Sequence, residues 1–414
     1  MTAGYARRRV LQTGAAAIGG GLVGWSTRDL TAGSAAASAG PESAAPAAPH
    51  GGQRVPFHGR HQAGILTPPQ AHAVLVGLDL RPAVDRTGLG RLMRLLSDDV
   101  ARLTQGRPAL ADTIGELAVL PARLTATFGF GPRVVRDLIP AAQRFDFNAL
   151  PPFATDRLRP AWGQTDLVVQ LCADDPVTLA HARRVLLRDA RAFATVRWTQ
   201  EGFRRAHGSE PAGTTMRNLM GQVDGTVNLS PDDRDHDRLL WSDLPGLEGG
   251  TFLILRRIAM DLVDWESLSR STREHTIGRR LADGAPLSGG TEHDAPDPSA
   301  VDDRGLPVID PASHVLRAQP VHPDERFLRR PYNYTRDETD PAWAPDGVEA
   351  GLLFVAFAAD PESQFVPVQQ RLAEQDRLNE WVTTVGSGVW AVPGGCSPDE
   401  GDYVGRALLG DPPL

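Results

Sequence analysis

The chain has 414 residues, of which 41% are hydrophobic, so it is long enough for about two to three domains with a buried core. Its formal net charge of −8 at pH 7, without a long basic run, argues against a nucleic-acid backbone as partner. All 43 basic residues are arginine, and the lack of lysine excludes Schiff-base enzymes, pyridoxal-phosphate sites and Walker-type phosphate loops.

The first 54 residues are predicted to be an export signal and a linker. Residues 7–25, RRRVLQTGAAAIGGGLVGW, join an arginine cluster to a glycine-rich apolar run that is too short to span a bilayer. This pattern is typical of a twin-arginine signal, whereas a basic amphipathic helix is disfavoured by the glycines. Residues 26–54 are rich in Ala, Ser, Pro and Gly, which predicts disorder. We therefore expect export to the periplasm or the extracellular space, without stable membrane insertion.

From residue 55 onward, two segments resemble each other. Residues 167–186 and 352–372 each contain an apolar run, an acidic-Pro turn and a helical pattern. Earlier apolar runs lie at 72–80 and 249–262, and helical stretches follow them at 89–105 and 266–281. This order predicts an α+β fold in two related halves, with helices covering one face of each sheet. We assign residues 55–212 to the N-terminal domain and residues 213–414 to the C-terminal domain.

The stretch GQVDGTVN, residues 221–228, places a carboxylate between glycines. Asp-Gly is a common turn pair, so a plain turn is one explanation. The glycine also lets the backbone approach a bulky ligand, with the Asp224 carboxylate directed toward it. Residues 284–311 are rich in Gly, Pro and Asp and are predicted to be a long loop of the kind that can cover a ligand. His314 follows this loop; an isolated histidine in such a place is usually a surface or hydrogen-bonding residue.

Several stretches together resemble the dye-decolorizing peroxidase family, from about residue 55 to the end of the chain. They are FHGRHQAGILTPPQ (57–70), GQVDGTVN, the run from GGTFLILRR to ADGAPLSG (249–289), SHVL with LRRPYNY, and GLLFVAFAADPESQFVPVQQRL. Together with the twin-arginine pattern, they resemble the exported, deferrochelatase-like branch linked to iron uptake. The resemblance implies two ferredoxin-like domains, made of antiparallel sheets with helices on one face, and one haem b per chain in the C-terminal half.

The resemblance also implies roles for individual residues. His314 matches the proximal ligand of the haem iron, Asp224 the aspartate on the opposite, distal side, and Arg329 the distal arginine. The remaining matches are Leu352 and Phe354 as the apolar distal wall, Glu380 as the hydrogen-bond partner of the proximal imidazole, and Gly225 and Thr226 as further cofactor-binding residues.

Two positions depart from the family pattern. The family often has Arg two residues after the proximal histidine, but this chain has Leu316 there and an arginine only at Arg317. Arg273 stands where Gln is common. We therefore assign no contact with a haem propionate to any arginine.

The resemblance implies a peroxidase that reduces hydrogen peroxide through a ferryl intermediate and oxidises dyes, phenols or other bulky reductants, whether small or polymeric. Asp224 would move a proton between the peroxide oxygens, and Arg329 would stabilise the developing charge. An apolar wall and a nearby guanidinium have opposite effects on the carboxyl, and we expect an acidic pH optimum. Electron relays are open among Trp162, Trp198, Trp241, Trp265, Trp343, Trp381, Trp390, Tyr332, Tyr334 and Tyr403.

Two other function classes stay open. One is a haem- or iron-handling protein of the deferrochelatase type, acting in iron uptake. The other is a non-enzymatic haem binder or a packaged cargo protein, which is disfavoured because the tail GRALLGDPPL leaves little room for a docking extension. Homo-oligomerisation is compatible with each of these functions.

Overall fold

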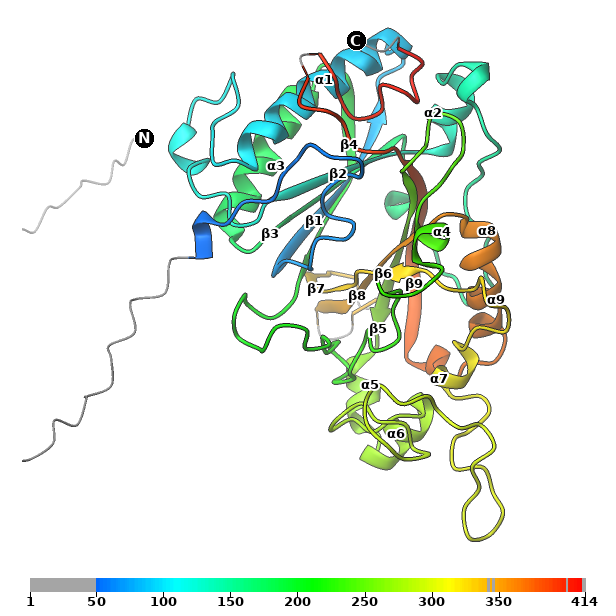
Figure 1. Ribbon diagram of the computed structural model, residues 1–414. Coiled ribbons are helices and arrows are strands. Elements are labelled where there is room, and N and C mark those ends of the chain that lie inside the picture. The colour runs from blue at the N-terminus through cyan, green and yellow to red at the C-terminus, as the bar shows by residue number, and fades with distance from the viewer. Residues whose placement is uncertain (1–49, 341–342, 345–346, 400, 412–414) are drawn as a thin grey trace, which may run out of the picture. The chain divides into compact units, whose positions relative to one another are not determined.

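The computed structural model describes residues 50–340, 343–344, 347–399 and 401–411 (Figure 1). The predicted twin-arginine signal and most of the predicted linker lie outside the described residues. Within the described ranges, no helix combines the length and the apolar character needed to cross a bilayer.

The N-terminal half forms one βαββαβ unit, the arrangement of ferredoxin-like domains. Its elements are β1 (His72–Leu80), α1 (Arg86–Leu103), β2 (Thr125–Phe130), α2 (Pro132–Asp137), β3 (Leu167–Ala173), α3 (Pro176–Ala190) and β4 (Ala194–Phe203). The strands are antiparallel and lie in the order β4-β1-β3-β2. Asp85 and Asp175 begin α1 and α3, because each carboxylate accepts a hydrogen bond from a backbone N–H of the first turn.

The C-terminal half repeats this plan with a longer first connection. Its strands are β5 (Thr251–Met260), β6 (Leu328–Arg329), β7 (Tyr332–Asp337), β8 (Val348–Ala358) and β9 (Val382–Val392). Its helices are α4 (His236–Leu240), α5 (Leu262–Ser267), α6 (Arg270–Ile277), α7 (His314–Arg317), α8 (Pro361–Gln364) and α9 (Val366–Gln375). The order β9-β5-β8-β7 matches the order of the first unit, and these strands are also antiparallel.

The two units share one continuous sheet (Figure 1). A single residue pair joins β2 to β9, Phe130 with Ala391, and another joins β4 to β7, Phe203 with Asn333. Together with the pairing of β5 and β8, these contacts close the strand order on itself. The predicted α+β class with two ferredoxin-like halves is confirmed. The predicted division at residues 212 and 213 falls in the connection between β4 and β5, and it stays a prediction.

Side chains that alternate along the strands form a core shared by the two units on one side of the sheet and an outer face of each unit on the other. Successive side chains of a strand point to opposite sides of the sheet. Leu75 of β1, Leu353 and Val355 of β8 and Trp390 of β9 belong to one buried cluster that draws on both units. The alternate residues of the same strands face outward, toward the helices. The outer face of each sheet is therefore where a helix or a ligand can pack.

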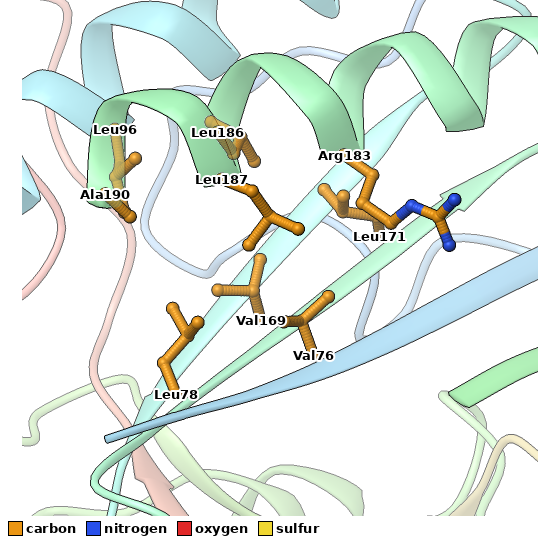
Figure 2. Close-up of a pocket in the computed structure, with 9 residues that line it drawn as sticks. All are labelled: Val76, Leu78, Leu96, Val169, Leu171, Arg183, Leu186, Leu187 and Ala190. Atoms are coloured by element: carbon orange, nitrogen blue, oxygen red, sulfur yellow. The ribbon is translucent and has the colours of Figure 1, made fainter. Parts of the chain in front are cut away.

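In the N-terminal unit, helices fill the outer face. Side chains of α3 point onto β1 and β3, as Figure 2 shows for Leu186 and Leu187 above Val76 and Val169. The space left between them is about 10 Å³, at the lower limit for one water molecule. Its lining is apolar apart from Arg183. This face is a packed core and offers no room for a ligand.

Most of the predicted elements are present, but one helix is divided. The run 72–80 coincides with β1, the stretch 249–262 contains β5, and 284–311 contains no helix or strand of two residues or more. The helical stretch predicted over 266–281 contains α6, but it runs past α6 at both ends and includes the last residues of α5. Ser269 interrupts it, because its hydroxyl caps α6 by accepting from Thr272 N, and Gly278 ends α6 in the left-handed conformation with φ +87°.

Candidate functional site

The outer face of the C-terminal unit carries an apolar wall rather than a complete helix layer. Leu352 and Phe354 of β8 face outward, because their neighbours Leu353 and Val355 lie in the joint core. Ile258 of β5 stands opposite Leu352 in the sheet register. Leu352 is buried and Phe354 is half-buried. The predicted wall residues therefore share one face of one strand.

Arg329 lies beside this wall at a break in the sheet edge. β6 pairs with β8 through only two residues, with Arg329 opposite Ala356, before Pro331 interrupts the edge. The side chain of Asn228 holds the Arg329 backbone from both sides: Oδ1 accepts from Arg329 N at 2.7 Å, and Nδ2 donates to Arg329 O at 2.9 Å. Arg329 Nη2 also donates to Val227 O at 2.8 Å. The arginine is therefore tied to the segment that follows Asp224.

Asp224 contacts Arg329 without forming a tight ion pair. Its Oδ1 lies 3.5 Å from Arg329 Nη1, at the outer limit of a hydrogen bond. Its Oδ2 accepts from Asn218 Nδ2 at 3.2 Å, and its backbone N donates to Met216 O at 2.8 Å. The side chains of Asp224 and Arg329 are 18% and 22% exposed. A carboxylate and a guanidinium thus stand side by side, and both are accessible to a small ligand.

His314 is held by a buried carboxylate. It begins the short helix α7, and its Nδ1 lies 2.6 Å from Asp376 Oδ2, which is 4% exposed. Burial lowers the pKa of His314, but the charge and the hydrogen bond of Asp376 outweigh burial and raise the pKa overall. The hydrogen bond fixes Nδ1 as the donor nitrogen and leaves the Nε2 lone pair for a metal. The side chain is 34% exposed, which suits a ligand that approaches from outside the chain.

The charges of the predicted distal residues, Asp224 and Arg329, act on the predicted proximal residue, His314. The charge of Asp224 raises the pKa of His314 and that of Arg329 lowers it, although Asp376 acts more strongly than either. The three residues come from a turn, a two-residue strand and a four-residue helix that are far apart in the sequence. Their charges therefore act on one another in the folded chain, and the roles assigned to them stay predictions.

The predicted contact between Glu380 and the proximal imidazole is wrong. The contact is made by Asp376, which precedes the 3-10 turn Arg377–Glu380 and caps it by accepting from Leu378 N at 2.9 Å. Glu380 is exposed at the other end of this turn, and its carboxylate makes no hydrogen bond or ion pair within the described part of the chain. The two carboxylates are four residues apart, so the motif match chose the wrong one. The useful signal is the capping position of Asp376, which orients its side chain.

The long loop reaches the distal segment through Glu292, which sequence reasoning missed. Its Oε1 accepts from Thr226 Oγ1 at 3.0 Å and from Thr215 Oγ1 at 2.6 Å. Its backbone carbonyl accepts from Arg279 Nη1 at 2.7 Å. Between Asp224 and Thr226, Gly225 adopts φ +129°, which side chains rarely allow. Thr226 thus directs its hydroxyl toward the loop, and any cofactor contact it makes stays a prediction.

The residues around His314 fit a haem. A haem needs a nitrogen ligand for iron, apolar contacts for its ring and donors for its propionates. His314 offers Nε2, and Leu352 with Phe354 offers the apolar contact. Arg273 of α6 and Arg317 of α7 each have a buried Nε without a hydrogen-bond partner in the described ranges. α6 and α7 lie against each other, so a carboxylate-bearing ligand beside them would supply the missing acceptors.

Sequence comparison decides the family. Profiles of the N-terminal and C-terminal domains of Dyp-type peroxidases match residues 62–204 and 215–397. The chain belongs to the Dyp-type peroxidase family. It is therefore a haem peroxidase.

Relatives of the Dyp-type family cover nearly all of the chain. The dye-decolorizing peroxidase of Thermobifida fusca is 36% identical, over 98% of this chain and 97% of the relative. A deferrochelatase of Escherichia coli K12 is 34% identical, over 86% of this chain and 88% of the relative. The crystal structure of a DyP-type peroxidase from Cellulomonas bogoriensis is 52% identical, with a TM-score of 0.81 over 87% of this chain and 99% of that one.

Proposed function

We propose that this Dyp-type peroxidase binds one haem b through His314 and reduces hydrogen peroxide with Asp224 and Arg329. A dye, a phenol or another bulky reductant then returns the electrons. The observation that carries the proposal is the pairing of Asp224 with Arg329 at 3.5 Å, in the same electrostatic neighbourhood as a histidine whose Nδ1 is already engaged. Haem, when bound, supplies the iron that binds peroxide and the electrons that cleave its O–O bond.

Each distal residue has a distinct task in this proposal. Asp224 takes a proton from one peroxide oxygen and delivers it to the other, which then leaves as water. Arg329 donates hydrogen bonds to the oxygen on which negative charge develops. Its long contact with Asp224 leaves this donor capacity available. Leu352 and Phe354 exclude water, which strengthens the field of the guanidinium.

On the proximal side, Asp376 positions the imidazole. Its carboxylate accepts from Nδ1 and gives the His314 ring more anionic character, which stabilises oxidised iron. We expect an acidic activity optimum, because carboxyl groups ordinarily exchange protons below neutral pH. An optimum above neutral pH would contradict proton transfer by Asp224.

The first test is the visible spectrum of the haem-loaded protein before and after one equivalent of hydrogen peroxide. We expect the Soret band to change with peroxide and to return when a dye is added. Asp224→Asn and Arg329→Leu should slow the reaction with peroxide by about 10²- to 10⁴-fold without loss of haem, and His314→Ala should lose the haem. A wild-type rate in Asp224→Asn would overturn the proposed role of this carboxylate.

A second candidate function is release of iron from haem. It is favoured by the 34% identity to a protein named deferrochelatase. The same spectra separate the two functions. A Soret band that gives way to free porphyrin without peroxide supports iron release, whereas a peroxide-dependent cycle with dye supports the peroxidase.

We also propose export by the twin-arginine route, supported by the arginine cluster and short apolar run of residues 7–25. A reporter fused to residues 1–54 should be exported in a folded state. Replacement of the three arginines at 7–9 by lysine should retain the reporter in the cytoplasm, and continued export of that variant would contradict the proposal.

A further inference from the structure

Asn218 is a buried side chain that connects a turn to the distal carboxylate. It is 8% exposed. Its Oδ1 accepts from Met220 N at 3.0 Å and from Gln222 N at 3.2 Å. Its Nδ2 donates to Gln222 Oε1 at 3.3 Å and to Asp224 Oδ2 at 3.2 Å. Two backbone N–H groups therefore face Oδ1, and this fixes which end of the amide carries the donor.

The backbone around Asn218 is equally constrained. Gly221 N donates to Asn218 O and Asn218 N donates to Gln222 O, both at 3.0 Å. Gly221 turns the chain with φ +82°. At the open end of this turn, Asp224 N donates to Met216 O at 2.8 Å. The distance between Asn218 and Asp224 is thus set by the turn itself.

The two carboxylate oxygens of Asp224 have different hydrogen-bond partners. Oδ2 faces the amide nitrogen of Asn218, which can only donate, so a proton placed on Oδ2 would oppose that donor. Oδ1 lies on the side of Arg329, at a distance that leaves room for exchange of a partner. Both neighbours can only donate, but the Arg329 contact at 3.5 Å is the longer one, so Oδ1 is the oxygen whose partner peroxide can replace.

From this geometry we propose that Asn218 is a positioning residue for peroxide reduction. Its amide holds Asp224 Oδ2 and keeps it unprotonated, so that Oδ1, beside Arg329, exchanges the proton with peroxide. This inference rests on the proposed function of Asp224. It adds the residue that orients the carboxylate and the oxygen that carries the proton.

The test is Asn218→Asp, which has the same shape and keeps Oδ1 for the two backbone donors. It replaces the Nδ2 donor by an oxygen that repels Asp224. In the haem-loaded protein, the acid limb of the pH–rate profile with peroxide should move up by about one pH unit or more. The pH dependence of cyanide binding to ferric protein, measured by the Soret shift, should move in the same direction, since hydrogen cyanide also gives up a proton on binding.

Asn333→Asp is the matched control. Asn333 is 6% exposed, and its Nδ2 donates to Arg217 O at 3.0 Å, next to Asn218 in the chain. It makes no hydrogen bond with Asp224 among the described residues. The control removes a similar donor and adds the same charge, and neither pH profile should move. Asn218→Ser is a second variant, because a serine hydroxyl can still hold Met220 N but is too short to reach Asp224. It should shift both profiles in the same direction, by less.

The outcomes separate this inference from the proposed function. Shifted profiles in the Asn218 variants, with none in Asn333→Asp, support a positioning role. If the rate of the Asn218 variants falls equally at every pH and the cyanide profile does not move, Asn218 only supports the turn and the inference is overturned. The proposed function still holds in that case if Asp224→Asn loses activity. A wild-type rate in Asp224→Asn overturns the proposed function and the inference together.

Discussion

Asp99→Asn is predicted to stabilise the protein, and to do so increasingly as the pH rises. Asp99 lies on α1, is 1% exposed, and has an Oδ2 without a partner in the described part of the chain. Burial, followed by a hydrogen bond with Asp189 and the charge of that residue, raises the pKa of Asp99 to about 7. Arg188 donates to Asp189, which keeps the second carboxylate ionised. Protonated Asp99 therefore donates to Asp189, and ionised Asp99 repels it.

The sign and size of this stabilisation follow from the pKa of Asp99 in the folded and in the unfolded chain. In the folded chain the pKa of Asp99 is about 7, above its ordinary value of 3.8. The contribution of protonated Asp99 to the free energy of unfolding is therefore fully present below about pH 4 and is lost as the pH rises through 7. The difference between pKa values of 3.8 and about 7 corresponds to about 4 kcal/mol. Asparagine stays neutral and keeps a donor for Asp189. We expect a gain of up to about 4 kcal/mol at pH 8, or roughly 5 °C in Tm for a chain of this length, and almost none at pH 4.

Thermal unfolding between pH 4 and pH 8 measures this difference. Asp98→Asn is the matched control, because Asp98 is the neighbouring residue, is 47% exposed and pairs with Arg102 on the surface. Its effect should be small at every pH. A gain in Asp99→Asn that is the same at pH 4 and pH 8, or a loss of stability at pH 8, would refute the argument from the buried carboxyl pair.

Two further predictions concern the site. Asp376→Asn should raise the reduction potential of the bound haem, because the His314 imidazole loses its anionic partner. Glu380→Gln should leave the potential unchanged. If a redox titration gives the reverse result, Glu380 is the carboxylate that acts on the imidazole. Gly225→Ala should lower the free energy of unfolding by about 1–3 kcal/mol, because a residue with a side chain is strained at φ +129°. The variant should also react more slowly with peroxide while it still binds haem. A wild-type free energy of unfolding and a wild-type rate would show that the turn at Asp224 adapts to the side chain.

The strands that the sequence predicts are those with long, uninterrupted apolar runs. β1 coincides with its predicted range. The run at 167–186 contains β3 and most of α3, and the run at 352–372 contains α8 and overlaps β8 and α9. By contrast, β2 has only six residues, TATFGF, and β9 contains two glycines and three hydroxyl side chains in VTTVGSGVWAV. Both segments contain Thr and aromatic residues, which favour strands, but neither has an uninterrupted apolar run, so the pattern alone does not single them out.

Residues of the site divide in the same way. Asp224, His314 and Arg329 stand in motifs of several residues, so the sequence alone identifies them as candidates. Asp376 and Glu292 stand in no such motif. Each acts through a partner that is distant in the chain: Asp376 through His314, and Glu292 through threonines on both sides of the distal turn. Only the folded chain shows which carboxylate reaches which partner.

The repeated fold also explains why the site occurs in only one half. In the first unit, residues 81–124 connect β1 to β2, and α1 and α3 close the outer face down to a space of about 10 Å³ (Figure 2). In the second unit, the corresponding connection from β5 to β7 spans 261–331 and provides the short helices α5, α6 and α7 and the long loop. The outer face of β8 packs against other side chains instead of long helices: Leu352 is buried, and the ring of Phe354 lies 5.9 Å from the ring of Phe365. The longer connection also carries His314, so the two units differ in the segment that provides the proposed haem ligand.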